Sequence, residues 1–158
     1  MIMSKSKPFI FAGSASQALG VQIANKLSFP LGNFERTQFR NSELRIRILS
    51  DVKGRDCIIV QSTNQPVQDH FFELLLLVDT LRGSGATTIV GVIPYFGYSR
   101  QHASFRQGEC ITADMIFRML KNLGMDEVIT ADFHNQEALN NTPLTVRNIS
   151  VLSSLAKT

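Results

Sequence analysis

The segment formed by residues 90–102 constrains the fold more than any other part of the sequence. It begins as a short apolar, β-branched run, breaks at Pro94 and Gly97, and then continues into Arg100 and Gln101. A short apolar run bounded by turn residues is typical of a strand that is buried on both faces. Strands of this kind belong to parallel sheets covered by helices. The segment therefore predicts an α/β domain with a mostly parallel sheet.

Polar side chains follow two of the predicted strands at their carboxyl ends. Arg100 and Gln101 follow the first strand, and a second strand over residues 128–132 ends with Asp132, shortly before His134. Open α/β sheets bind ligands at this edge, and the planar guanidinium of arginine suits oxyanions. Together these residue types indicate a phosphorylated ligand with a divalent metal.

The remaining pattern alternates strands and helices in three layers. It predicts strands at 9–12, 57–60 and 88–93, helices at 14–27, 66–83 and 111–123, and an antiparallel hairpin from strands 37–39 and 44–49. In the second hairpin strand, apolar residues alternate with arginines, which is typical of a half-exposed strand. After His134 the pattern fades, and no further element is predicted.

The helix that follows Pro66 is apolar around most of its circumference at residues 74–78. Such a helix is buried on more than one side. Two explanations stay open at this point: a subunit interface, or a core helix beneath a loop. The charged fraction of 18% is below the usual ~25%, which favours surface covered by a partner or by a missing domain. We expect a homo-oligomer.

Composition excludes several classes of protein. A net charge of +3 is too small to indicate nucleic-acid binding. No apolar run suits a membrane span or a signal core, so we expect a cytoplasmic protein. Cys57 lies in an apolar strand and is predicted to be a buried thiol, and the two cysteines do not suit a zinc site.

Common nucleotide and nucleophile motifs are missing. The sequence has no P-loop and no nucleophile elbow. Gly83 and Gly85 follow a helix and are interpreted as its end rather than as a dinucleotide fingerprint. Ser14 and Ser16 stand where an anion could bind at a helix start, but helix capping is the favoured interpretation.

Five ordered segments resemble the N-terminal half of ribose-phosphate pyrophosphokinases (phosphoribosyl pyrophosphate synthases). They are the loop Phe39-Arg40-Asn41-Ser42-Glu43, the strand end Gln61-Ser62, the leucine-rich helix 73–78, the segment 93–101, and the strand end Asp132-Phe133-His134. The resemblance covers roughly residues 9–134. It implies a fold like that of phosphoribosyltransferases.

The resemblance also implies a reaction and a set of site residues. The family transfers diphosphate from ATP to ribose 5-phosphate, which requires positioning, a metal and cationic donors rather than a protein nucleophile. It implies catalytic roles for Arg100 and His134 and a Mg²⁺ site at His134 and Asp132. The ATP-binding residues that it implies are Phe39, Asn41, Ser42, Glu43, Arg100 and Gln101, with the hairpin residues acting on a neighbouring subunit's ATP.

The sequence departs from the family pattern at two places. His102-Ala103-Ser104 stands where the family usually has Asp and basic residues, and Asn140-Asn141-Thr142-Pro143 replaces a Gly-Phe-Phe segment. The family's pentose-phosphate loop is also missing. We therefore expect residues 1–158 to be the single N-terminal domain of a two-domain synthase, inactive alone, either truncated or a natural half-protein. The alternative is a non-catalytic, nucleotide-binding regulatory relative.

Overall fold

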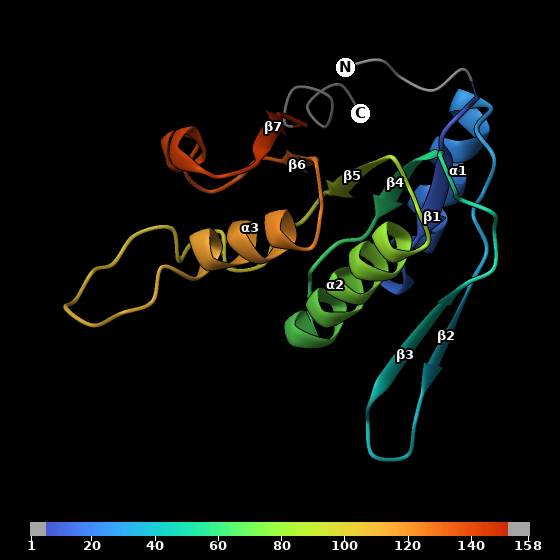
Figure 1. Cartoon of the computed structure of the whole chain (residues 1–158). Coiled ribbons are helices and arrows are strands. Elements are labelled where there is room, and N and C mark those ends of the chain that lie inside the picture. Colours follow the sequence, from blue (N-terminus) through green and yellow to red (C-terminus); the bar gives the residue numbers. More distant parts are fainter. Residues whose placement is uncertain (1–5, 152–158) are drawn as a thin grey trace.

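The structure, a computed structural model, describes residues 6–151 and contains a five-stranded parallel sheet (Figure 1). Its strands lie in the spatial order β1 (Phe9–Ala12), β4 (Asp56–Val60), β5 (Thr88–Ile93), β6 (Glu127–Ala131) and β7 (Thr145–Ile149). Every neighbouring pair is parallel. The predicted α/β fold with a parallel sheet is therefore confirmed, and the two strands predicted to carry the site are direct neighbours.

Strand β7 is an element that the sequence pattern did not reveal. It lies at the edge of the sheet beside β6, after the short 3-10 helix η2 (Glu137–Asn141). Its residues alternate between exposed and half-buried, and none is fully buried. An edge strand has one neighbour and retains polar residues, so the apolar signature of the inner strands is lacking here.

Helices cover the two faces of the sheet and produce the three layers. α1 (Gln17–Leu27), preceded by the 3-10 helix η1 (Ser14–Ser16), packs on one face against β1 and β4. It approaches so closely that a Cβ at Gly20 would lie 2.5 Å from the Cβ of Ala12. α2 (Val67–Gly83) and α3 (Thr112–Asn122) lie on the opposite face (Figure 1). No helix in the described range 6–151 is long and apolar enough to cross a membrane.

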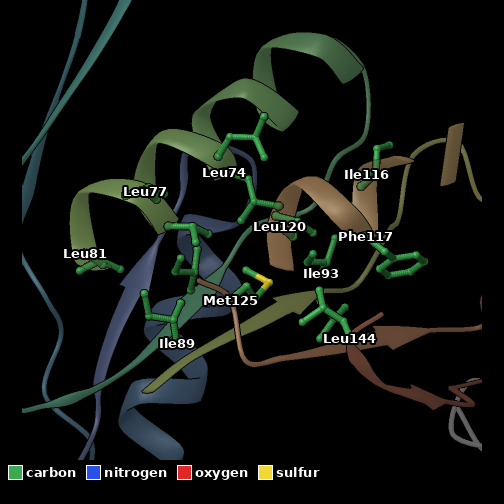
Figure 2. Packing of buried hydrophobic residues seen from close by; sticks show 14 of the residues in the cluster. Leu74, Leu77, Leu81, Ile89, Ile93, Ile116, Phe117, Leu120, Met125 and Leu144 are labelled. Atoms are coloured by element: carbon green, nitrogen blue, oxygen red, sulfur yellow. The ribbon is translucent and has the colours of Figure 1, made fainter. Parts of the chain in front are cut away.

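The main hydrophobic core lies between the sheet and helices α2 and α3. Figure 2 shows the side chains of α2, α3 and the strands meeting there, among them Leu74, Leu77, Leu81, Ile89, Ile93, Ile116, Phe117 and Leu120. Leu74, Leu77 and Val78 are completely buried within this single chain. The structure thus favours the core-helix explanation for α2, and its apolar circumference does not require a second subunit.

The hairpin of β2 (Phe34–Gln38) and β3 (Leu44–Ile48) forms a separate two-stranded sheet. Figure 1 shows it extending away from the parallel sheet. Phe34, Ile46 and Ile48 at its base pack against the core. The first strand ends at Gln38, because Phe39 already belongs to the turn, where its N–H donates to the carbonyl of Glu43 at 2.8 Å.

Candidate functional site

A cavity of about 580 Å³ lies at the carboxyl ends of β5 and β6. Its lining includes four residues that the sequence predicted for the site: Arg100 and Gln101 after β5, and Asp132 and His134 after β6. The two strands pair in parallel, so their carboxyl ends meet at one edge of the sheet. The topology therefore brings these four side chains to a single hollow.

The loop after β5 is held close to the end of β4. The N–H of Gly97 donates to the hydroxyl of Thr63 at 2.7 Å, and a Cβ at Gly97 would lie 2.7 Å from the carbonyl oxygen of Thr63. Tyr98, the next residue, has a φ of 65°, an uncommon conformation for a bulky residue. This close approach directs the loop so that Arg100 and Gln101 lie at the cavity.

Arg100 and Gln101 present hydrogen-bond donors to the cavity. Arg100 is exposed, and its guanidinium takes no part in the ion pairs of the described residues. The side-chain oxygen of Gln101 accepts a hydrogen bond from the hydroxyl of Thr112 at 2.6 Å. This bond leaves the amide nitrogen of Gln101 free to donate. A guanidinium and an amide side by side suit the oxygens of a phosphate chain.

Asp132 and His134 form the other wall of the cavity. Asp132 has a φ of 43°, and its Oδ2 accepts a hydrogen bond from the N–H of Val151 at 3.1 Å. His134 is exposed. Within residues 6–151, no three His, Cys, Asp or Glu side chains gather to hold a metal. The Asp132 carboxylate suits Mg²⁺, which typically uses one or two carboxylates together with substrate phosphates and water.

The predicted hairpin residues do not reach this cavity. Phe39, Asn41 and Glu43 are exposed at the hairpin tip, outside its lining. Ser42 lines a different hollow of about 280 Å³ between the hairpin and α2. Local contacts occupy part of the tip: the side-chain oxygen of Asn41 accepts from the N–H of Glu43 at 3.2 Å, and the Arg45 guanidinium lies over the Phe39 ring.

A buried carboxylate fastens the hairpin to the body of the protein. Glu73 of α2 is fully buried, and its Oε2 accepts a hydrogen bond from Nε of Arg36 in β2 at 2.8 Å. Ser14 donates to the same carboxylate from its N–H at 2.8 Å and from its hydroxyl. The expected capping role of Ser14 and Ser16 is wrong, because neither makes a side-chain cap bond. Instead, Ser16 accepts from the N–H of Ser62.

Six of the ten lining residues were not among the predicted site residues: Val67, Gln68, Tyr95, Gly97, Tyr98 and Ser99. Gln68 in the first turn of α2 donates to the hydroxyl of Tyr98 at 3.0 Å, and Tyr95 is 59% exposed beside them. The two tyrosines belong to the segment already singled out. For Gln68 the available signal was topological, because α2 begins at the carboxyl end of β4, the strand beside β5.

The chain resembles known proteins over most of its length. The sequence profile of the N-terminal domain of ribose phosphate pyrophosphokinase matches residues 8–124. The ribose-phosphate pyrophosphokinase of Helicobacter pylori is 41% identical over 125 residues, which are 79% of this chain and 39% of that protein. That of a Marinomonas species is 38% identical over 130 residues, or 82% of this chain and 41% of that protein.

A solved structure shows the same arrangement. The crystal structure of phosphoribosylpyrophosphate synthetase from Mycobacterium smegmatis matches with a TM-score of 0.90 and 27% identity, over 96% of this chain and 51% of that one. The chain spans about two fifths of the length of the curated relatives it matches. Because the profile of the family's N-terminal domain matches residues 8–124, this chain belongs to the ribose phosphate pyrophosphokinase family.

Proposed function

We propose that this chain is the ATP-binding half of a ribose-phosphate pyrophosphokinase, and that its cavity at the ends of β5 and β6 binds the triphosphate of ATP with Mg²⁺. One observation carries the proposal: Arg100, Gln101, Asp132 and His134 surround one hollow, and the Arg100 guanidinium has no ion-pair partner within the described residues. A cation without a protein partner at a strand-end cavity suits an anionic ligand.

The two walls of the cavity have different roles, one toward the phosphates and the other toward the metal. Arg100 donates to phosphate oxygens and stabilises the charge that develops during transfer of the diphosphate to ribose 5-phosphate, and the amide of Gln101 orients the chain of phosphates. Asp132 and His134 would hold Mg²⁺, which supplies positive charge beside the phosphates. The products of the whole enzyme are then 5-phosphoribosyl 1-diphosphate and AMP.

The sugar phosphate is proposed to bind to the second half of the longer enzyme. Among residues 6–151, the other oxyanion-suited groups are not gathered into a site. Both donors of Ser14 are used on Glu73, Thr63 is fully buried, and Arg106 is exposed in the loop after Gln101. We therefore expect the chain alone to be inactive, because catalysis by positioning needs both substrates fixed in line.

The hairpin tip is proposed to contact ATP on a neighbouring copy in a cytoplasmic homo-oligomer. Phe39, Asn41 and Glu43 are exposed and lie outside the cavity of their own chain. A tip that is fastened at its base by Arg36 and free at its end is suited to reach another subunit. Light scattering at high micromolar concentration tests this, and a monomer alone would contradict it.

Calorimetry with ATP or ADP and magnesium tests the nucleotide site. Arg100→Ala should weaken binding by about 1.5–3 kcal/mol, the value of a hydrogen bond to a charged group. Arg106→Ala removes the same charge from the exposed loop outside the cavity and should leave affinity almost unchanged. Equal affinity in wild type and Arg100→Ala would remove Arg100 from the site.

A second candidate function is a non-catalytic regulatory relative that binds nucleotide at the same cavity. The observation favouring it is His102, which stands where the family usually has an acidic residue. An assay of AMP release distinguishes the two. The longer protein containing this chain should form AMP from ATP, magnesium and ribose 5-phosphate if it is a synthase, and none if it is a regulator. The same assay on the chain alone should show no substrate-dependent AMP.

A further inference from the structure

His102 joins the two walls of the cavity without lining the cavity itself. Its Nδ1 lies 3.2 Å from the carbonyl oxygen of Ser99, in its own loop, and its Nε2 lies 3.0 Å from Nδ2 of Asn135, in the loop after β6. Arg100 precedes His102 by two residues, and Asn135 directly follows His134. A single imidazole therefore connects the loop that carries the cationic donor with the loop that carries the metal-binding candidates.

The hydrogen bonds around Asn135 determine which nitrogen of His102 carries the proton. The N–H of Glu137 donates to Oδ1 of Asn135 at 3.0 Å, so the Asn135 amide must present its NH₂ group to His102. His102 Nε2 therefore accepts, and Nδ1 carries the proton that it donates to Ser99. The geometry selects one neutral tautomer, because the bond at one ring nitrogen sets the protonation of the other.

Close to the sheet, the loops after β5 and β6 are connected by packing of apolar side chains. Phe96 and Phe133 are both buried, and their rings meet edge to face at 5.6 Å between centroids. Further from the sheet, the side chains of the loops are joined by the hydrogen bond between His102 and Asn135. This bond is thus placed to set the separation of the outer residues Arg100 and His134.

We propose that His102 is a positioning residue that fixes the Arg100 wall relative to the His134 wall, so that the binding of metal and of nucleotide reinforce each other. The proposal rests on the proposed function for its ligands. It does not require His102 to touch them, because His102 lines a separate hollow of about 200 Å³ beneath α3 and η2. Two ligands are coupled when each favours the same arrangement of the site.

The first test measures how much magnesium strengthens ADP binding to this chain, as the ratio of Kd without magnesium to Kd with it. His102→Ala should lower this ratio by about fivefold or more, as expected for loss of a typical coupling between sites. His102→Gln should restore it, because the side-chain oxygen of Gln can accept from Asn135. His70→Ala is the matched control, since His70 bonds to Asn64 away from the cavity. An unchanged ratio in His102→Ala, or no rescue by His102→Gln, would overturn the proposal.

The second test needs no ligand and separates this proposal from the proposed function. Nitrogen-15 NMR of the free chain should show His102 protonated at Nδ1, and Asn135→Ala should weaken that preference without reversing it, because the Ser99 carbonyl still accepts from Nδ1. A proton on Nε2 in the wild-type chain would refute the positioning role whatever the chain binds. If the tautomer is as expected while wild type binds no ADP, the proposed nucleotide site fails and the coupling of the two walls fails with it. In that case the Asn135 bond stands as a structural contact alone.

Discussion

The loops at the strand ends were expected to contact the ATP of their own chain and the tip of the hairpin the ATP of a neighbouring subunit, and the fold of one chain holds the two regions apart. Arg100, Gln101, Asp132 and His134 line one cavity, whereas Phe39, Asn41 and Glu43 lie outside it. The first group follows neighbouring parallel strands, whose carboxyl ends must meet. The hairpin has no such constraint, because it forms its own two-stranded sheet. The resemblance assigned both groups to ATP binding, whereas the structure brings only the residues after β5 and β6 to one cavity.

The two regions also differ in how their backbones are held. Tyr98 and Asp132 at the cavity, like Ser42 at the hairpin tip, have positive φ values. In the hairpin this conformation belongs to an exposed turn. At the cavity it is imposed by close contacts, with Gly97 against Thr63 and Asp132 bonded to β7 and Val151. Uncommon backbone conformations persist where the surroundings enforce them, so the cavity loops are the more rigidly determined.

The largest loss of stability is expected when the hairpin loses its contact with the buried carboxylate of Glu73. Glu73→Ala removes a fully buried carboxylate that accepts bonds from Arg36 and Ser14. The free energy of unfolding should fall by about 3 kcal/mol, since removing one partner of a buried pair is strongly destabilising. Urea denaturation measures this loss, and hydrogen exchange in residues 34–48 should rise. Glu35→Ala breaks an exposed pair with Arg47 and should cost less than about 0.5 kcal/mol. Equal losses would show that the hairpin does not depend on Glu73.

The reactivity of the two thiols tests whether the parallel sheet beneath the cavity excludes solvent, in contrast to the exposed hairpin tip and cavity loops. Burial, followed by the nearby Asp56 carboxylate, raises the pKa of Cys57 to about 11 from 9.0. At pH 8 the folded chain should therefore carry about a hundredfold less Cys57 thiolate than the unfolded chain. Exposed Cys110 should react quickly with a thiol reagent and Cys57 only slowly. Equal reaction rates for Cys57 and Cys110 would show that the sheet does not exclude the reagent.

The raised pKa of Cys57 also makes the free energy of unfolding depend on pH. Because folding favours the protonated Cys57 thiol, its stabilising contribution is complete below about pH 9 and is lost as the pH rises toward 11. Cys57→Ser should flatten this part of the stability profile. Cys110→Ser serves as the control and should leave the profile as in wild type.

A smaller effect is expected where the loop after β5 touches the end of β4. A Cβ at Gly97 would lie 2.7 Å from the Thr63 carbonyl oxygen and 2.8 Å from Val67. Gly97→Ala should therefore cost about 2 kcal/mol by overpacking and should also weaken nucleotide binding, because Arg100 lies in the displaced loop. Gly83→Ala meets nothing within 4 Å and should be neutral or slightly stabilising. A neutral Gly97→Ala would show that the loop is not determined by this contact.

The smallest effect probes the hairpin tip directly. In a monomeric chain, Asn41→Ala should change ADP affinity less than about twofold, or ~0.4 kcal/mol, because Asn41 lies outside its own chain's cavity. Calorimetry at concentrations where light scattering shows a monomer provides the measurement. A tenfold loss under those conditions would mean that the tip folds onto its own cavity, and the contrast between the two regions would disappear.

Much of the fold could be read from local patterns. The strands β1, β4, β5 and β6 and the three α-helices were expected close to their observed positions, because each carries an apolar periodicity of its own. The placement of Arg100 and His134 at one cavity was also predictable, since it follows from strand polarity. Strand β7 and helix η2 were not predicted, because an edge strand and a short 3-10 helix lack a strong periodicity.

By itself, the sequence determined the order of the strands up to β6 and of the three α-helices, the family, and the residues at the strand ends. Only the tertiary structure decided that Glu73 fastens Ser14 across 59 residues, that Gln68 joins the cavity, and that His102 meets Asn135 across 33. The reason is physical. Periodicity and turn chemistry act over a few residues, whereas contacts between side chains distant in sequence depend on how the elements pack in three dimensions.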